Sequence, residues 1–187
     1  MLGGGLSPEA VSELVSASIE ASKPQLFHVE QRQAATVNSL RTTGAADSSG
    51  GWDQIQLTTV VTNEVDGASL ASNAVTLPAG DYEVDGVVLA CQGRGIRARL
   101  FNQTAGATLL ADDGNPMLST SGWAGDQAGT SQQNTQMTFK GKFTLVSTST
   151  VVLQQATNAI ASPAYGKASN EDSLVNVYCQ LLFYKLP

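Results

Sequence analysis

A run of mostly apolar residues near the end of the chain, from Leu174 to Tyr184, predicts a β-strand. Side chains alternate across a β-strand, so this run has two rows. The first row is wholly apolar and contains Val175, Val177, Cys179, Leu181 and Phe183. The second row mixes large apolar groups with amides and contains Leu174, Asn176, Tyr178, Gln180, Leu182 and Tyr184. We expect the first row in the core. The second is too apolar for ordinary surface and too polar for a dry core, which predicts a subunit interface formed by Leu174, Tyr178, Leu182 and Tyr184.

Similar alternation predicts strands over Leu26 to Ala34, Trp52 to Val65 and Thr135 to Val146. In the second of these runs, Ile55, Leu57, Thr59 and Val61 fall together on one side. A shorter strand is expected from Asn73 to Leu77.

Turn residues indicate how some of these strands connect. Pro78-Ala79-Gly80-Asp81 predicts a turn before a strand from Tyr82 to Gln92. Gly93-Arg94-Gly95 predicts a hairpin to Ile96 to Gln103, and a Ser-Thr turn predicts that Val151 to Ala156 pairs with the strand before it. Eight or more short strands with no helix among them predict an all-β fold, a two-sheet antiparallel jelly-roll sandwich.

The first 25 residues have a different pattern. Ser7-Pro8-Glu9 is typical of a helix start, because it offers a capping hydroxyl, a proline at the first helical position and an acid in the first turn. The apolar residues then follow helical spacing: Val11, Leu14, Val15 and Ile19. Lys23-Pro24 ends the run. We therefore divide the chain into an N-terminal anchor segment, 1–25, and a jelly-roll trimerisation domain, 26–187.

The expected helix needs a partner, because an isolated helix of this length is marginal in water. Its apolar stripe could pack on the same helix of sister chains or in a groove of another protein. It could also fold back on its own domain.

Composition narrows the function classes. Only 14% of the 187 residues are charged, and the net charge of −6 disfavours binding to nucleic acid. The N-terminus lacks the pattern of a signal peptide, and no run approaches the ~18 apolar residues of a membrane span, so we expect a soluble, cytosolically made protein with no membrane partner. Cys91 and Cys179 are expected to be free buried thiols.

Catalytic and metal-binding patterns are weak. His28, the single histidine, lies on the polar side of a strand with no evident carboxylate to orient it. Asp112-Asp113-Gly114-Asn115 resembles a calcium loop in its oxygen donors but lacks the remaining spacing, so a turn is favoured. We expect no enzymatic activity, no cofactor and no metal.

Ligand binding has three weak candidates. The long loop from Leu109 to Asn134 carries Trp123, Asp113 and Asp126, which could stack on a sugar and bind its hydroxyls, although packing of Trp123 under the loop is favoured. Alternation places Arg97 and Arg99 on one face, where they could grip an acidic subunit or an anionic glycan, or remain solvated. Trp52 could likewise stack on a sugar or pack under a loop.

Several of these segments, in this order, resemble the complement globular-head and tumour-necrosis-factor-like superfamily. They are Leu77-Pro78-Ala79-Gly80-Asp81-Tyr82-Glu83-Val84, the run from Gln136 through Ala156, and Leu181-Leu182-Phe183-Tyr184. Gly67 to Asn73, Leu77 to Tyr82 and Arg99 to Gly106 also resemble tail-fibre, head-fibre and decoration proteins of tailed bacteriophages. The resemblance covers about residues 26–187 and implies a tight homotrimer displayed by an N-terminal segment.

The function that this resemblance implies is that of a virion structural protein, a trimeric capsid decoration or head-fibre protein. Its expected partners are sister chains and, through residues 1–25, other virion proteins of the capsid or tail. The alternative is the receptor-binding tip of a tail fibre, which would recognise a host glycan.

Overall fold

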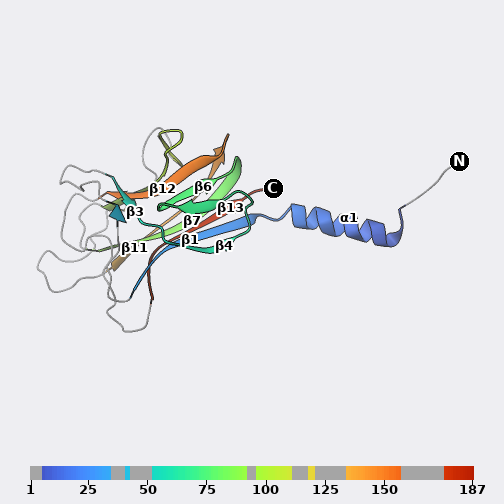
Figure 1. Cartoon of the computed structure of the whole chain (residues 1–187), viewed down its shortest axis with the longest axis horizontal. Coiled ribbons are helices and arrows are strands. Elements are labelled where there is room, and N and C mark those ends of the chain that lie inside the picture. The colour runs from blue at the N-terminus through green and yellow to red at the C-terminus, as the bar shows by residue number, and fades with distance from the viewer. Residues whose placement is uncertain are drawn as a thin grey trace, which may run out of the picture.

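The computed structural model of the chain consists of a β-sandwich and one helix that projects from its end (Figure 1). It describes residues 6–34, 41–42, 52–91, 96–110, 118–120, 134–156 and 175–187. The helix and the strands that precede the middle of the chain are α1 (Pro8–Ala21), β1 (Gln25–Ala34), β2 (Arg41–Thr42), β3 (Asp53–Ile55), β4 (Thr59–Asn63), β5 (Ser69–Ala71), β6 (Ala74–Leu77) and β7 (Gly80–Cys91). The later strands are β8 (Ile96–Asn102), β9 (Ala107–Thr108), β10 (Leu118–Thr120), β11 (Asn134–Leu145), β12 (Ser149–Ala156) and β13 (Val175–Lys185).

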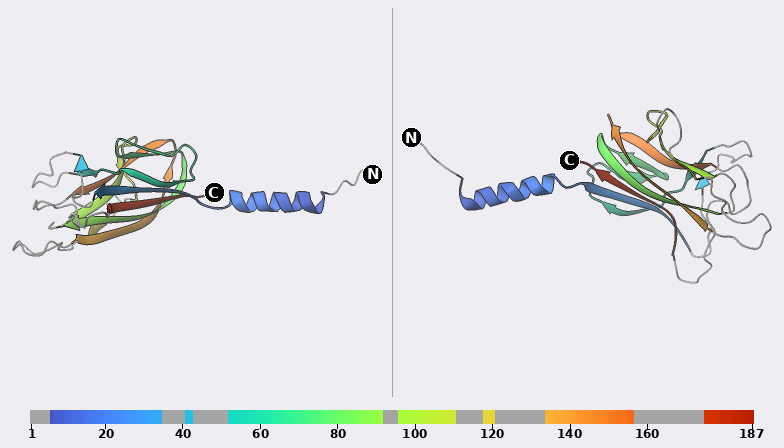
Figure 2. Two further views of the ribbon diagram at one scale, coloured as in Figure 1. Left: turned by 60° about the horizontal axis from the view of Figure 1, so that its bottom comes forward. Right: turned by 180° about the vertical axis from the view of Figure 1, so that it is seen from behind.

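Two antiparallel sheets face each other across one core. Sheet A has the strand order β11-β7-β13-β1-β4. Sheet B follows the order β10-β8-β12-β3-β2, with β6 also on β12, β5 on β6 and β9 on β8. Figure 2 shows the same sandwich turned by 60° and from behind. The expected fold class, an all-β two-sheet sandwich with a short N-terminal helix, is confirmed.

The core lies between the inward rows of both sheets. Its largest fully buried side chains include Phe27 of β1, Tyr82 of β7 and Leu153 of β12. From β13 it takes Cys179, Leu181 and Phe183, as expected from the apolar row. Large apolar groups buried at this density supply the main favourable term in folding.

Two expected hairpins are absent, because strands adjacent in sequence lie in opposite sheets. β7 pairs with β11 and β13 in sheet A, whereas β8 pairs with β9, β10 and β12 in sheet B. β11 and β12 are divided between the sheets in the same way. Alternation shows that a strand has one buried face, but a strand in either sheet can bury that face against the same core.

The run from Trp52 to Val65 is also divided between the sheets. β3 belongs to sheet B and β4 to the edge of sheet A. Ile55 and Leu57 are buried as expected, whereas Val61 is exposed. One continuous strand was therefore the wrong prediction for this run.

A bulge in β13 changes which of its side chains are buried. Gln31 and Arg32 of β1 are consecutive, but their partners in β13 are Cys179 and Val177, so Tyr178 is the extra residue. Tyr178 and Cys179 are consequently both buried, at 2% and 1% exposure. Val175 and Val177 are 61% and 41% exposed. The expectation that these two valines lie in the core and that Tyr178 lies on the open face is wrong, because a bulge shifts the alternation by one residue.

The Leu77 to Val84 segment forms the turn that leads into β7. Gly80 has φ +148°, and a Cβ there would meet Cε of Lys185 at 2.9 Å, so glycine fits both the backbone and the space. The hydroxyl of Tyr82, which is fully buried, donates to the carbonyl of Pro78 at 2.9 Å. Its ring stacks on that of Phe143, with centroids 5.5 Å apart.

The helix is confirmed, and it does not fold back on the sandwich. Ser7 caps it by accepting a hydrogen bond from the Ala10 amide at 3.2 Å. Its apolar stripe is open to solvent: Val11, Leu14, Val15 and Ile19 are between 46% and 59% exposed. No helix in the described part of the chain is both long enough and apolar enough to cross a bilayer.

Gln155 allows a test of core polarity. Its side chain is buried, and neither of its amide atoms has a hydrogen-bond partner among the residues that the structure describes. A buried amide without partners costs about 1–3 kcal/mol. We expect Gln155→Met, which keeps the volume, to leave the free energy of unfolding in urea unchanged or to raise it by about 1 kcal/mol.

The neighbouring Gln154→Met is the matched control. It removes an acceptor that Arg99 uses at 2.8 Å and should destabilise the fold by about 1 kcal/mol. A loss of stability in Gln155→Met as large as that in Gln154→Met would contradict this account of the core.

Tyr82 predicts a specific loss of stability at alkaline pH. Burial raises the pKa of Tyr82 from 10.0 to about 12, because the phenolate is disfavoured inside the core. Its contribution to stability is complete below pH 10 and is lost as the pH rises towards about 12. We expect Tyr82→Phe to cost about 1 kcal/mol at pH 7, through the lost bond to Pro78, and the difference from wild type to shrink between pH 10 and pH 12.

Urea unfolding across this pH range measures the effect. Tyr184→Phe, on the opposite face of the same sheet, is the control. A gap between Tyr82→Phe and wild type that is constant with pH would contradict the assignment.

Candidate functional site: the outer face of the five-stranded sheet

Sheet A has an outer face that no described element covers (Figures 1 and 2). We call the outward side chains of four of its five strands, β1, β13, β7 and β11, the outer face of sheet A. From β1 and β13 it takes Leu26, His28, Glu30, Gln180, Leu182 and Tyr184. From β7 and β11 it takes Glu83, Asp85, Val87, Leu89, Gln136, Thr138, Lys140, Lys142 and Thr144.

The middle of this face is apolar. Leu182 lies between His28 of β1 and Asp85 of β7, and Tyr184 lies between Leu26 and Glu83. Leu26, Leu182 and Tyr184 are all half-buried in the single chain. An apolar centre surrounded by polar groups is the usual composition of a protein–protein interface. Leu182 and Tyr184 are therefore on the face where the sequence placed them.

A charge ladder runs along one side of this centre. Lys140 of β11 lies 2.9 Å from a carboxylate oxygen of Glu83 and 3.6 Å from one of Asp85, and Lys142 lies 3.7 Å from Glu83. The hydrogen bond from Lys140 lowers the pKa of Glu83, and the same bond raises the pKa of Lys140. These groups are well exposed, so the pairs contribute little stability but arrange acidic β7 beside basic β11.

A buried carboxylate lies on the other side of the centre. Glu30 is 4% exposed, and one of its oxygens accepts from the amide nitrogen of Gln180 at 3.0 Å. Its second oxygen accepts from Nε of Arg32 at 2.6 Å. Nε2 of His28 lies 3.0 Å from both the first oxygen and the Gln180 nitrogen. The carboxylate is thus fully paired, which is the condition for a tolerable buried charge.

This cluster corrects the expectation that His28 has no carboxylate near it. Glu30 is two residues away on the same strand face, and Gln180 pairs with Glu30 across the strands. The i, i+2 spacing of His28 and Glu30 could have indicated this pair from the sequence. Only the register between β1 and β13 shows that Gln180 is the third residue of the cluster. The described contacts of His28 are with Glu30 and Gln180, which hold its ring in place on the strand.

Cys179 is chemically protected. It is a free, buried thiol, as expected, and burial raises its pKa well above the ordinary range. Within the described ranges, no group of three or more His, Cys, Asp or Glu side chains could hold a metal ion.

Several residues selected from the sequence lie outside the described residues: Leu174, Asp113, Trp123, Asp126 and the turn at 112–115. The side chains of Cys91 and Arg97 are likewise not described. Tyr178 belongs to β13 but is buried beside the bulge, so it is not on the open face.

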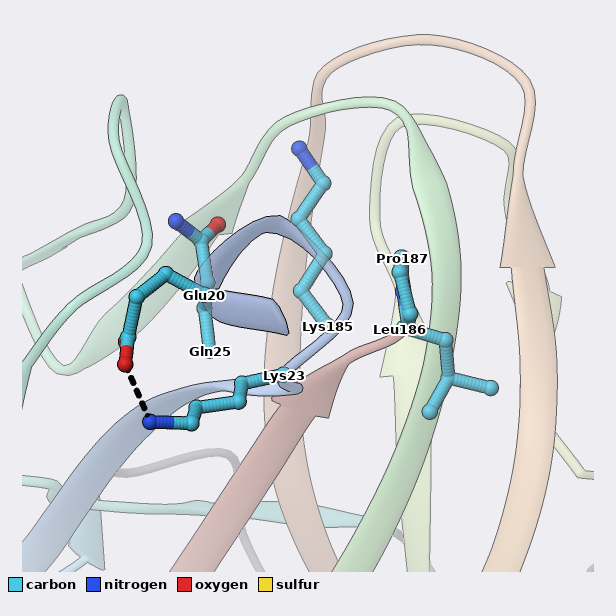
Figure 3. Close-up of a pocket in the computed structure, with 6 residues that line it drawn as sticks. All are labelled: Glu20, Lys23, Gln25, Lys185, Leu186 and Pro187. Carbon is cyan, nitrogen blue, oxygen red and sulfur yellow. Dashed lines mark hydrogen bonds and ion pairs between the residues drawn. The ribbon is translucent and has the colours of Figure 1, made fainter. Parts of the chain in front are cut away.

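The helix joins the sandwich next to the C-terminus. Ser22 caps the helix, and three residues separate Ala21 from the start of β1. The amide of Leu186 donates to the carbonyl of Asp81 at 2.8 Å and fixes the chain end to β7. Figure 3 shows the pocket of about 300 Å³ at this junction, with Lys23 paired to Glu20 across from Lys185 and Pro187.

Comparison with known proteins identifies the fold. Murine APRIL, in a crystal structure at pH 8.0, superposes with a TM-score of 0.52 over 88% of this chain and 100% of its own, at 16% identity. The Eiger TNF from S. frugiperda superposes with a TM-score of 0.53 over 88% of this chain and 94% of its own, at 10% identity. Both are TNF-family jelly-roll domains. At these identities the likeness shows the TNF-like jelly-roll fold alone. No protein-family model and no curated protein matches the sequence.

Proposed function

We propose that the protein is a homotrimeric structural component of a tailed-bacteriophage particle, a capsid decoration or head-fibre protein without enzymatic activity. In this proposal it is made in the host cytoplasm and resides in the virion. The sandwich forms the trimer through the outer face of sheet A, and residues 1–25 attach it to the capsid or tail proteins. No nucleic acid, membrane or cofactor takes part.

The observation that supports the proposed trimer is the uncovered apolar centre on the outer face of sheet A. Leu26, Leu182 and Tyr184 leave apolar area in water at a cost of roughly 25 cal/mol per Å². The surrounding charges are already paired within the chain, so covering this face would leave none of these charges buried without a partner. Trimer formation is also what the TNF-like sequence resemblance implies.

The observation that supports attachment is the projecting helix. Its apolar stripe is exposed, while Glu9, Glu13 and Glu20 lie on the other side of the same helix. A helix with one apolar stripe is suited to docking in a groove of a partner. A virion protein fixed by such a segment needs no further contact from the sandwich.

The bacteriophage source is supported by the sequence motifs at Gly67 to Asn73, Leu77 to Tyr82 and Arg99 to Gly106. Imaging of intact particles with this protein labelled tests it. Label on the head supports the decoration or head-fibre role. Label at the tip of a tail fibre would replace it with the glycan-recognising role, and no label on the particle would overturn both.

The trimer predicts the effect of a charge at the centre of the outer face. We expect Leu182→Lys to convert the trimer to a folded monomer, because three unpaired ammonium groups would be buried near one another, at several kcal/mol each. Light scattering measures the mass, and circular dichroism verifies the fold. Thr76→Lys, on the outer side of sheet B, adds the same charge and should stay trimeric. A trimeric Leu182→Lys would place the interface elsewhere.

The attachment predicts that the helix stripe, rather than the sandwich, determines incorporation. Deletion of residues 1–25 should leave a folded trimer that no longer joins the particle. Val15→Asp should weaken binding to capsids at least tenfold, since it places a charge in the stripe, whereas Ser16→Asp on the polar side should not. Sedimentation of variants with naked capsids measures binding, and a truncated protein that still binds would contradict the proposal.

A further inference from the structure

Arg99 lies in an aromatic clamp on the outer side of sheet B, on the face opposite to the proposed trimer contact. Its guanidinium carbon is 4.2 Å from the centroid of the Trp52 ring and 4.7 Å from that of Phe101. Arg99 and Phe101 are alternate residues of β8, and Trp52 directly precedes β3. The two rings fix the guanidinium more firmly than a solvated arginine would be fixed.

Polar neighbours hold only part of this guanidinium. Nε donates to Oε1 of Gln154, its cross-strand partner, at 2.8 Å, and Nη1 donates to the hydroxyl of Thr108 at 3.4 Å. An arginine has five N–H donors. The other three make no hydrogen bond to the residues that the structure describes.

The positive charge has no counterion in the described part of the chain, although the protein as a whole is acidic. Within the described residues, Arg99 contacts only neutral groups, and no carboxylate of those residues lies within ion-pair distance of it. Burial lowers the pKa of Arg99, as expected for a cation that has lost water without gaining an anion. By contrast, Arg32 on the other sheet is paired with Glu30.

We propose that the Arg99 clamp is a binding site for a single organic carboxylate. A guanidinium that lies over two aromatic rings, and whose outer N–H groups are not used by the described residues, can present two parallel donors, which match the two oxygens of a carboxylate. One arginine balances one negative charge, and in a chain of net charge −6 a multiply charged phosphate or sulfate would be repelled more strongly. The edges of Trp52 and Phe101 provide apolar contact for the carbon atoms next to the carboxylate. This site is independent of the proposed trimer and of the virion role.

The carboxylate could belong to an acidic sugar or to an acidic amino-acid side chain, and two probes distinguish these sources. Sodium glucuronate represents the sugar, and sodium butyrate represents the aliphatic chain of a glutamate. Tighter binding of glucuronate indicates additional contacts to the sugar hydroxyls. Equal binding of both probes indicates that only the carboxylate is recognised, as for a side chain of a neighbouring protein.

The experiment follows the Nε–H resonance of Arg99 in the full-length protein by NMR. The resonance is identified by its disappearance in Arg99→Lys. We expect it to shift saturably with either probe, with half-saturation at about millimolar concentration, and not with sodium chloride at equal ionic strength. Thermal shift under the same conditions gives a second readout that also applies to the variants.

Two variants test the geometry. Arg99→Lys keeps the charge but loses the paired donors, and it should bind at least about tenfold more weakly. Gln154→Glu supplies a carboxylate from within the clamp and should abolish binding of both probes while raising the melting temperature, which also shows that the variant folds. Lys23→Gln, between the helix and β1, removes one positive charge elsewhere and should bind as wild type does.

The proposal is overturned by a shift that does not saturate or that chloride reproduces. It is equally overturned if Arg99→Lys or Gln154→Glu binds either probe as tightly as the wild type. In these cases the contacts of Arg99 serve only to hold Trp52 against sheet B.

Discussion

The sandwich depends on β13 being paired on both sides. It lies between β1 and β7, so the last strand of the chain joins the first strand to the middle of sheet A. Its inward side chains Leu181 and Phe183 are fully buried, and its outward side chains Leu182 and Tyr184 form the apolar centre of the open face. The same strand therefore supplies both the core and the proposed contact surface. Changes to its register would move both sets of side chains at once.

The two faces of the sandwich have different polar chemistry. On the outer face of sheet A, charges are matched within the chain, by Lys140 with Glu83 and by Arg32 with Glu30. On the outer side of sheet B, Arg99 is held by two rings, an amide and a hydroxyl, and none of the described residues supplies a counterion. A surface whose charges are matched costs less to bury against a copy of itself than one with unpaired charges, whereas an unmatched cation favours a partner of opposite charge. The proposed roles of the two faces follow from this difference.

Local pattern in the sequence was enough for the fold class, because alternation and turn chemistry are local properties. Ser72 and Asn73 have φ values of +49° and +65°, and Gly67 and Gly106 have +79° and +65°. These residues belong to the motifs that resemble fibre and decoration proteins of phages. The motifs specify turns, which explains why they are informative about the fold. A turn can occur in proteins of any origin, so the turns in the structure do not bear on the source of the protein.

Pairing between distant residues could not be read from the same pattern. The bulge at Tyr178 depends on how β1 aligns with β13, more than 140 positions away, and no alternation in either strand signals it. The assignment of β7 and β8 to opposite sheets likewise depends on how distant strands pack around the core. The cluster of Glu30, His28 and Gln180 and the clamp of Arg99, Trp52 and Phe101 arise only once these pairings are fixed. Candidate sites are therefore less predictable than the strands that carry them.

The helix and the outer face of sheet A are linked through β1, which follows α1 after three residues. An assembly that packs three copies of sheet A together also brings three helices to one end of the sandwich, where Figure 1 shows the helix projecting. A single helix of fourteen residues with four large apolar groups would bind a partner weakly. In the proposed trimer, three such helices would bind with an effective concentration set by their short connections, and modest individual contacts would add up to durable attachment. On this argument the proposed attachment depends on the proposed trimer, because only the trimer would bring together enough helices to hold the protein on its partner.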